Sequence, residues 1–298
     1  MPETLTSCIF AGGRATRLYP HTLRPSNQKP LLLMGSSDRR LIDFSLEISA
    51  VADHSFVFTN HDPIKSEEVE AHISMFPNVI PLMDKREVGA GSLLDYYRIL
   101  CREDPNGNMV ILCSDHVYEG FSLSAFSKYH NDMQKDMTIL AVPPKNYGSY
   151  IEVENGLVLA TQESYTEGCL SSTGTYIMKN RALLECLRTK ILEGWDGELF
   201  SVYSHIFLPM VMQANVASFT LPENGYWDDT GTLQRYYRNN MRLSKNRNVI
   251  SRKAQINSNV EIHSSVILDD VDLSKVKEIK KSIVSSSLNG YNVTRIDE

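Results

Sequence analysis

Short apolar runs alternate with amphipathic segments along the first half of the chain. Near-continuous apolar strands separated by helices are typical of a parallel sheet that is covered on both faces. The pattern therefore predicts an α/β fold with a doubly wound, mostly parallel sheet. The predicted strands are TLTSCIF (4–10), SFVFTN (55–60), MVILCSD (109–115) and DMTILAVPP (136–144), and the predicted helices are RLIDFSLEISAV (40–51) and SLSAFSKYHNDMQ (122–134).

The middle of the chain, residues 143–248, mixes both patterns. Ligands of doubly wound sheets bind at the carboxyl ends of the strands. Three polar segments follow predicted strands and are candidates for that edge: AGGRATR (11–17), CSDH (113–116) and PPKNYG (143–148). The further predicted strands are GLVLATQ (156–162), STGTYIMK (172–179) and VASFTL (216–221), and the further helices are RALLECLRTKIL (181–192) and LQRYYRNNMRLS (233–244).

The hydrophobic period changes to six after residue 248. An apolar residue recurs at every sixth position, with small or branched residues at the same spacing beside it, which indicates the hexapeptide repeats of a parallel β-helix. So short a stack must dock on the main domain or on another subunit to bury its faces, and an irregular apolar tail is the alternative. We predict one domain over 1–248 and a short β-helical tail over 249–298. The two series are Ile250, Ile256, Ile262 and Leu268, and Ala254, Val260 and Val266.

Composition and charge limit the classes of molecule that the protein can be expected to bind. The formal net charge is −6 and lysines and arginines are not clustered, which argues against nucleic-acid binding and against a membrane surface. We expect small molecules or other proteins as partners. The N-terminus lacks a signal pattern and no apolar run has the length of a membrane span, so we expect a cytoplasmic location. The cysteines lack C-x-x-C spacing and are interpreted as reduced thiols: Cys8, Cys101, Cys113, Cys169 and Cys186.

The glycine loop after the first strand carries the first candidate chemistry. A tight turn is the simple interpretation of Gly12-Gly13. The spacing of GGRATR fits neither the dinucleotide motif G-x-G-x-x-G nor the phosphate loop G-x-x-x-x-G-K-[ST]. A glycine backbone can approach phosphate closely, Arg17 can bind phosphate oxygens bidentately, and Lys29 adds a point charge. Together they point to a nucleoside triphosphate.

The same residues carry a family resemblance. AGGRATRLYPHT…KP resembles the G-G-x-G-T-R-L-x-P-x-T…K-P signature of sugar-1-phosphate nucleotidyltransferases, and the likeness extends over nearly the whole chain. The branch that RRLIDFSLE, SDHVY and YWDDTGTLQRYYRNN resemble most is ADP-glucose pyrophosphorylase, a glucose-1-phosphate adenylyltransferase. Further segments match in order: VGAGSLL, CSDHVY, KNYGSYIEVENG and GYWDDTGTLQRYY.

The resemblance implies a Rossmann-like nucleotidyltransferase domain with a left-handed β-helical tail. It implies that a sugar-1-phosphate attacks the α-phosphate of a nucleoside triphosphate, with ATP and glucose-1-phosphate as the first expectation, and that pyrophosphate leaves. Arg17 would hold the departing phosphates and Lys29 the α-phosphate. The residues expected to wrap the nucleotide are Ala11, Gly12, Gly13 and Thr16, with Gly89 beside the base; a helix-leading turn is an equal interpretation of Gly89.

Asp115 and Asp229 match the family's ligands for magnesium (Mg2+), a cation that prefers hard oxygen donors. Taken singly, each aspartate is more simply a helix cap or a turn former. Asp228 is the neighbouring alternative to Asp229, and we choose Asp229 because the following Gly-Thr fixes the register. The positions that match sugar contacts of the family are Tyr147, Gly148, Ser172 and Gly174.

Two departures from the family pattern keep a second function open. The family's F-x-E-K-P lysine, which binds the sugar phosphate, is replaced by Glu163 or Ser164 in LATQESYTEG, and Ala15 replaces the third glycine of the loop. The hypotheses are an active transferase, including one for another nucleotide and sugar phosphate, and a catalytically weak regulatory or scaffold subunit. We expect a homo-oligomer or a subunit of a hetero-oligomer.

Overall fold

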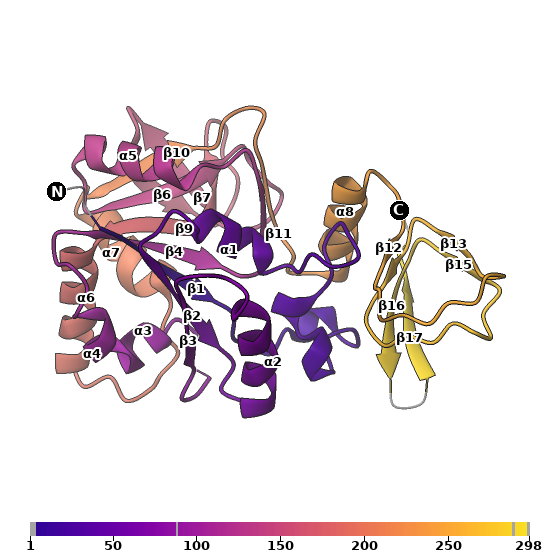
Figure 1. Ribbon diagram of the computed structural model, residues 1–298. Coiled ribbons are helices and arrows are strands. Elements are labelled where there is room, and N and C mark those ends of the chain that lie inside the picture. Colours follow the sequence, from indigo (N-terminus) through magenta and orange to yellow (C-terminus); the bar gives the residue numbers. More distant parts are fainter. Residues whose placement is uncertain (1–3, 88, 288–289, 297–298) are drawn as a thin grey trace.

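The computed structural model describes residues 4–87, 89–287 and 290–296. Its centre is a nine-stranded sheet in the order β3-β2-β1-β4-β9-β6-β10-β8-β7 (Figure 1). All seven apolar runs that we predicted to be strands lie in this sheet. Its strands are β1 (Leu5–Phe10), β2 (His54–Thr59), β3 (Val79–Met83), β4 (Asn108–Cys113), β6 (Met137–Val142), β7 (Tyr150–Glu154), β8 (Leu157–Gln162), β9 (Leu170–Lys179) and β10 (Val216–Thr220).

Of the nine strands of this sheet, seven run in one direction and β8 and β9 run the other way, so the prediction of a mostly parallel sheet is confirmed. β1 is parallel to β2 and β4, whereas β9 lies antiparallel between β4 and β6, and β7 and β8 form an antiparallel pair. An apolar run indicates that both faces of a strand are buried. A central antiparallel strand is buried in the same way, so the run does not reveal the direction of the strand. Because β4 and β6 are both antiparallel to β9, they run in one direction, and β1, β4 and β6 all end at the same edge.

Helices cover both faces of the sheet, as a doubly wound arrangement requires. Ile9 and Cys8 are neighbours in β1, yet they belong to separate cores on opposite faces. The first core contains α1 (Asp43–Ser49), α2 (Pro63–Ile73) and α5 (Leu123–Met133). The second contains α3 (Ser92–Asp95), α4 (Tyr97–Leu100), α6 (Asn180–Leu192) and α7 (Leu208–Met212), the last preceded by a π-helix, η4 (Tyr203–Phe207).

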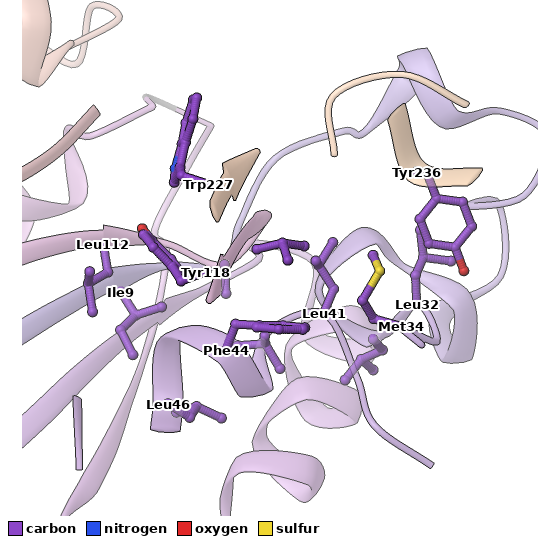
Figure 2. Packing of buried hydrophobic residues seen from close by; sticks show 14 of the residues in the cluster. Ile9, Leu32, Met34, Leu41, Phe44, Leu46, Leu112, Tyr118, Trp227 and Tyr236 are labelled. Atoms are coloured by element: carbon purple, nitrogen blue, oxygen red, sulfur yellow. The ribbon is translucent and has the colours of Figure 1, made fainter. Parts of the chain in front are cut away.

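The first core continues beyond the sheet to α8 (Leu233–Ser244). Figure 2 shows this continuity, from Ile9 and Leu112 in the sheet to Tyr236, which lies beside Leu32. Tyr236 is fully buried and its hydroxyl donates a 2.7 Å hydrogen bond to the Leu33 carbonyl. This contact fixes α8 against the chain that follows β1. That chain contains three short 3₁₀ helices, η1 (Thr16–Leu18), η2 (Pro25–Asn27) and η3 (Lys29–Leu31).

The strands after α8 stack in parallel. Val249 pairs with Val266 and Val266 with Ile283, so paired residues stand 17 positions apart, and the second set of strands has the same interval. The left-handed sense of the coil and the limits 1–248 and 249–298 stay predictions, and residues 1–3, 297 and 298 lie outside the described chain. The strands are β12 (Val249–Ile250), β14 (Val266–Ile267), β16 (Ser282–Ser287) and the antiparallel β17 (Gly290–Arg295), with β13 (Glu261–His263) and β15 (Glu278–Lys280) alongside.

This C-terminal unit docks on the main domain, which was one of the two predicted alternatives. The buried His21 ring lies between the hydroxyls of Ser285 and Thr294, at 2.8 Å from each. Burial lowers the pKa of His21 to about 4, so the ring is neutral. Arg40 and Asp269 form a 2.9 Å ion pair across the same contact. Among the described helices, none combines the length and hydropathy that crossing a membrane requires.

Candidate active site

Two cavities adjoin at the carboxyl edge of β1 and β4. The smaller, of about 460 Å³, brings together the predicted residues Gly12, Gly13, Thr16, Arg17, Lys29 and Asp115. The larger, of about 510 Å³, contains the predicted Gly89 and Gly174. Both are lined by Phe10, Gly12, Gly13, Glu87 and Cys113, so the two cavities share a boundary.

The glycine loop forms the wall between the cavities. A Cβ atom on Gly12 would lie 2.7 Å from the Asp84 carboxylate, so any larger residue there would have to displace that side chain. Ala15, which replaces the third glycine of the family motif, has a φ of 52°, in the left-handed region. A side chain in that region costs about 1 kcal/mol. Ala11 is buried and its amide donates to the Phe58 carbonyl at 2.8 Å, so it belongs to the core, and its contact with a nucleotide stays a prediction.

Lys29 and Asp115 form an ion pair at the floor of the smaller cavity. Lys29 begins η3, and its ammonium donates to Asp115 Oδ2. Burial alone would raise the pKa of Asp115, but Lys29 and His116 outweigh burial and hold this pKa well below its usual range. Asp115 is therefore ionised, and its carboxylate can accept hydrogen bonds or hold a cation.

The second predicted aspartate lies on the strand next to Asp115. β5 (His116–Glu119) pairs antiparallel with β11 (Tyr226–Asp229), and the register sets Asp229 opposite His116. Thr230 closes this pair, because its amide and its hydroxyl donate to the Asp115 carbonyl at 2.9 and 2.7 Å. Asp229 Oδ1 accepts a 2.7 Å hydrogen bond from the amide of Gly231, which lines the smaller cavity. Two carboxylates 114 positions apart in sequence thus reach one site.

Asp228, the alternative to Asp229, has a different environment. Its side chain is fully buried and accepts hydrogen bonds from the hydroxyls of Tyr147 and Tyr226, the latter at 3.1 Å. Arg238 adds an ion pair at 2.7 Å. Three donors therefore occupy this carboxylate, whereas Asp229 accepts a hydrogen bond from Gly231, which lines the smaller cavity. The arrangement favours the register that we chose from the following Gly-Thr.

Arg235 is a site residue that sequence reasoning missed. Its guanidinium donates to Asp229 Oδ2 at 2.8 Å and stacks over the Tyr147 ring at 4.2 Å, and only 13% of its side chain is exposed. A Cβ atom on Gly231 would lie 2.5 Å from Arg235 Nη2 and 3.4 Å from Arg17 Nη1, so two guanidiniums flank this glycine. The available signal was a cation in the first turn of α8, where the helix dipole disfavours positive charge.

The donor set fits magnesium. Asp115 and Asp229 provide hard carboxylate oxygens at one site, and magnesium in phosphate-transfer sites is held by one or two carboxylates together with substrate oxygens. Cys113 and His116 also place donor atoms within 4.8 Å of Asp115. Burial, and then the charge of Asp115, raise the pKa of the Cys113 thiol, so it stays protonated and is a poor ligand for this ion.

The larger cavity combines predictions for the base and for the sugar. Gly89 has a φ of 61°, and a Cβ atom there would lie 2.8 Å from the Phe200 carbonyl, with which its segment pairs. Val88, in the same motif, lies outside the described residues. Gly174, predicted to contact the sugar, lines the same cavity and has a φ of 76°. The glycine at 89 is therefore explained by a close backbone approach, and its contact with the base stays a prediction.

The other predicted sugar contacts lie on one connected segment. The Ser172 amide donates to the Ser149 carbonyl at 2.9 Å, which ties β9 to the exposed loop at Gly148. Tyr147, on that loop, reaches Asp228 and Arg235. Glu163 and Ser164, the two candidates for the missing lysine position, are both exposed.

Asp84, also missed in the sequence, gives a pH-dependent prediction. The pKa of Asp84 is raised to about 6, and burial is the main cause. The hydrogen bond from Ser92 opposes this shift, and the charge of Asp95 adds to it. The folded state therefore binds more protons than the unfolded state between about pH 4 and 6, and stability falls as the pH rises through this window. Asp84→Asn, which keeps an acceptor for Ser92, should gain about 3 kcal/mol of unfolding free energy at pH 7 and nothing at pH 3. Urea unfolding at both pH values measures this, and an equal gain at both would contradict it.

Three comparisons with known proteins bear on the site. A profile of the family described as nucleotidyl transferase matches residues 6–246. A glucose-1-phosphate adenylyltransferase of Acetivibrio thermocellus is 27% identical over 267 residues, which cover 81% of this chain and 60% of that protein. One of Bacillus licheniformis is 25% identical over 327 residues, covering 99% of this chain and 82% of the relative.

A solved structure resembles the fold. It is a protein of Bacillus anthracis described as a candidate glucose-1-phosphate thymidylyltransferase, in complex with sucrose, with a TM-score of 0.66 and 16% sequence identity. The match covers 81% of this chain and 96% of that one. At this identity the likeness shows a shared fold.

Proposed function

Because the chain belongs to the nucleotidyl transferase family, we propose that it transfers a nucleotidyl group from a nucleoside triphosphate to a sugar-1-phosphate. The observation that carries the proposal is the convergence of Asp115 and Asp229 beside the glycine loop, each with its own cation, Lys29 and Arg235. A site for phosphate transfer needs such preorganised charge, because the reaction asks little covalent chemistry of the protein.

In the proposed reaction, an oxygen of the sugar-1-phosphate forms a bond to the α-phosphorus. The bond from this phosphorus to the bridging β-oxygen breaks, and pyrophosphate departs with the electron pair. Lys29 is placed to neutralise charge on the α-phosphate, and Arg17 to hold the departing phosphates. Asp115 and Asp229 would hold magnesium, which when bound supplies positive charge to the phosphate oxygens.

Arg235 adds a cation that the family motif does not call for. It lies between Asp229 and the ring of Tyr147, which we predicted to contact the sugar. The exposed Glu163 and Ser164 offer no positive charge for the sugar phosphate. Arg235 is placed to take part in this role, because its guanidinium has five donors and its hydrogen bond to Asp229 uses Nη1.

ATP and glucose-1-phosphate are the proposed substrates. Two relatives named glucose-1-phosphate adenylyltransferase support this choice, together with the matching segments around Asp115 and Asp229. The alternative is a regulatory or scaffold subunit with weak activity. It is favoured by the strained Ala15 in the glycine loop and by the missing lysine.

Pyrophosphate formation tests the proposal. ATP, CTP, GTP, UTP and dTTP are each combined with a panel of sugar-1-phosphates and magnesium, and Asp229→Asn serves as the control. We expect the highest rate with ATP and glucose-1-phosphate and a large loss in the control. If a different nucleotide and sugar phosphate react best, the proposed reaction stands and the proposed substrates are replaced by that pair. Absence of pyrophosphate with every pair would contradict the proposal and favour the scaffold alternative.

A further inference from the structure

A third cavity, of about 290 Å³, lies on the face of α8, and three of its lining residues contact the buried Asp228. All its lining side chains carry hydrogen-bond donors, and half of them are cations. Arg238 and Arg242 are one helical turn apart on α8, and therefore lie on the same side of the helix. The lining residues are Lys145, Asn146, Tyr147, Tyr226, Arg238 and Arg242.

The cations of this cavity exceed the carboxylates that balance them. Arg238 pairs with the buried Asp228 at 2.7 Å, and Arg242 pairs with Glu119 at 2.9 Å. No carboxylate of the described chain lies within ion-pair distance of the Lys145 ammonium, which faces the Tyr226 ring at 5.3 Å. One positive charge is thus left over, and an anion would balance it.

The electrostatic environment of Lys145 agrees with this excess. Burial lowers its pKa, the charge of Asp228 partly offsets burial, and Arg238 and Arg242 lower the pKa further. Arg238 and Arg242 act on Lys145 as like charges. An anion bound among them would relieve this repulsion.

The cavity is also held in shape before any ligand arrives. The Lys145 amide donates to Ser171 Oγ at 2.8 Å, and its carbonyl accepts from the Tyr150 hydroxyl at 2.6 Å. The Tyr226 hydroxyl is fixed by Asn239 at 2.6 Å, and the Arg242 guanidinium covers the Tyr226 ring at 4.0 Å. Little side-chain ordering is therefore needed on binding.

We propose that this cavity binds the phosphate group of a phosphate monoester through Lys145, Arg238 and Arg242. Arginine and lysine donors arranged around a small polar cavity match the oxygens of this group. Two sources share the chemistry: the phosphate of the sugar substrate and a separate phosphorylated effector. Tyr147 connects this cavity to the candidate active site, because its ring packs under Arg235, which pairs with Asp229. Phosphate binding itself does not depend on the proposed nucleotidyl transfer.

Calorimetric titration of orthophosphate into the intact protein tests the site. Lys145→Met and Arg242→Gln should each weaken binding about 10-fold, as expected for the loss of one charge-assisted contact. An Arg238 variant would remove the ion pair of the buried Asp228, so Arg238 is left unchanged. The controls with the same substitutions are Lys128→Met and Arg252→Gln, whose side chains are each 76% exposed and each pair with an aspartate outside the cavity. They should bind as the natural chain does.

Glucose-1-phosphate in place of orthophosphate separates the two sources. If Lys145→Met weakens its binding to the same extent, the cavity receives the phosphate of the substrate. If only orthophosphate binding falls, the ligand is a separate phosphate compound. The proposal is overturned if the natural chain does not bind millimolar orthophosphate, or if Lys145→Met and Arg242→Gln bind it no more weakly than their controls. Thermal melting of each variant checks that the fold is retained.

Discussion

Lys29→Ala is expected to lower kcat by roughly 10²- to 10³-fold, the loss measured when one preorganised donor to a developing charge is removed. Lys29 is placed to neutralise charge on the α-phosphate and also pairs with Asp115, so the variant loses a contact to substrate and unbalances a proposed metal ligand. Steady-state pyrophosphate release, with nucleotide and sugar phosphate each varied, measures the loss.

The Lys29 variant should keep its fold, because Asp115, whose counter-charge it removes, is 26% exposed and lines an open cavity where water can solvate the carboxylate. Lys128→Ala, on the exposed side of α5, is the control and should retain full activity. A Lys29→Ala protein with activity within threefold of the control would contradict the proposed role of Lys29. If the Lys29→Ala protein does not melt cooperatively, the activity of Lys29→Met, which keeps the alkyl chain, is compared with that of the control instead.

Asp228 and Asp229 are expected to respond in opposite ways to the same substitution. Asp229→Asn should lower kcat by roughly 10²-fold or more, because the altered residue is a proposed metal ligand, while stability changes little. Asp228→Asn should lower the unfolding free energy by about 2 kcal/mol, because it replaces two charge-assisted tyrosine hydrogen bonds at a buried position by weaker ones, whereas the half-exposed Arg238 remains solvated. The two neighbours thus serve as controls for each other.

The measurements are pyrophosphate release and urea unfolding of both variants. The assignment of the two aspartates would be contradicted if Asp228→Asn were the catalytically dead but stable protein. It would equally fail if Asp229→Asn kept the activity of the natural chain at saturating magnesium.

The sequence was sufficient to predict the strands and the loop that build the site. Apolar runs are long-range signals of burial, so β1, β4 and β6 and the polar segments after them could be placed at one edge. The direction of β9 could not be predicted, because burial on both faces does not distinguish a parallel from an antiparallel strand. The pairing of β5 with β11 was also missed, although it is this short ladder that brings Asp229 opposite His116.

Arg235 and Asp84 show a different limit of the sequence. Each matters because of partners far away in the chain: Asp84 touches the loop at Gly12, and Arg235 packs over Tyr147. The family motifs that match this chain do not specify a charged residue at either position. Ala15 differs from these two residues, because the sequence alone showed that it replaces a glycine of the family motif. The structure shows in addition that its backbone is left-handed.

The central claim is that the α-phosphate of the nucleotide is joined to the sugar phosphate. The most direct measurement uses ATP labelled separately at the α- and γ-phosphates, with glucose-1-phosphate and magnesium, and follows both labels by chromatography. The account predicts α-label in a nucleotide sugar and γ-label in pyrophosphate, in equal amounts and only when the sugar phosphate is present. Release of γ-label as orthophosphate, or loss of α-label to a free nucleotide without sugar phosphate, would contradict it.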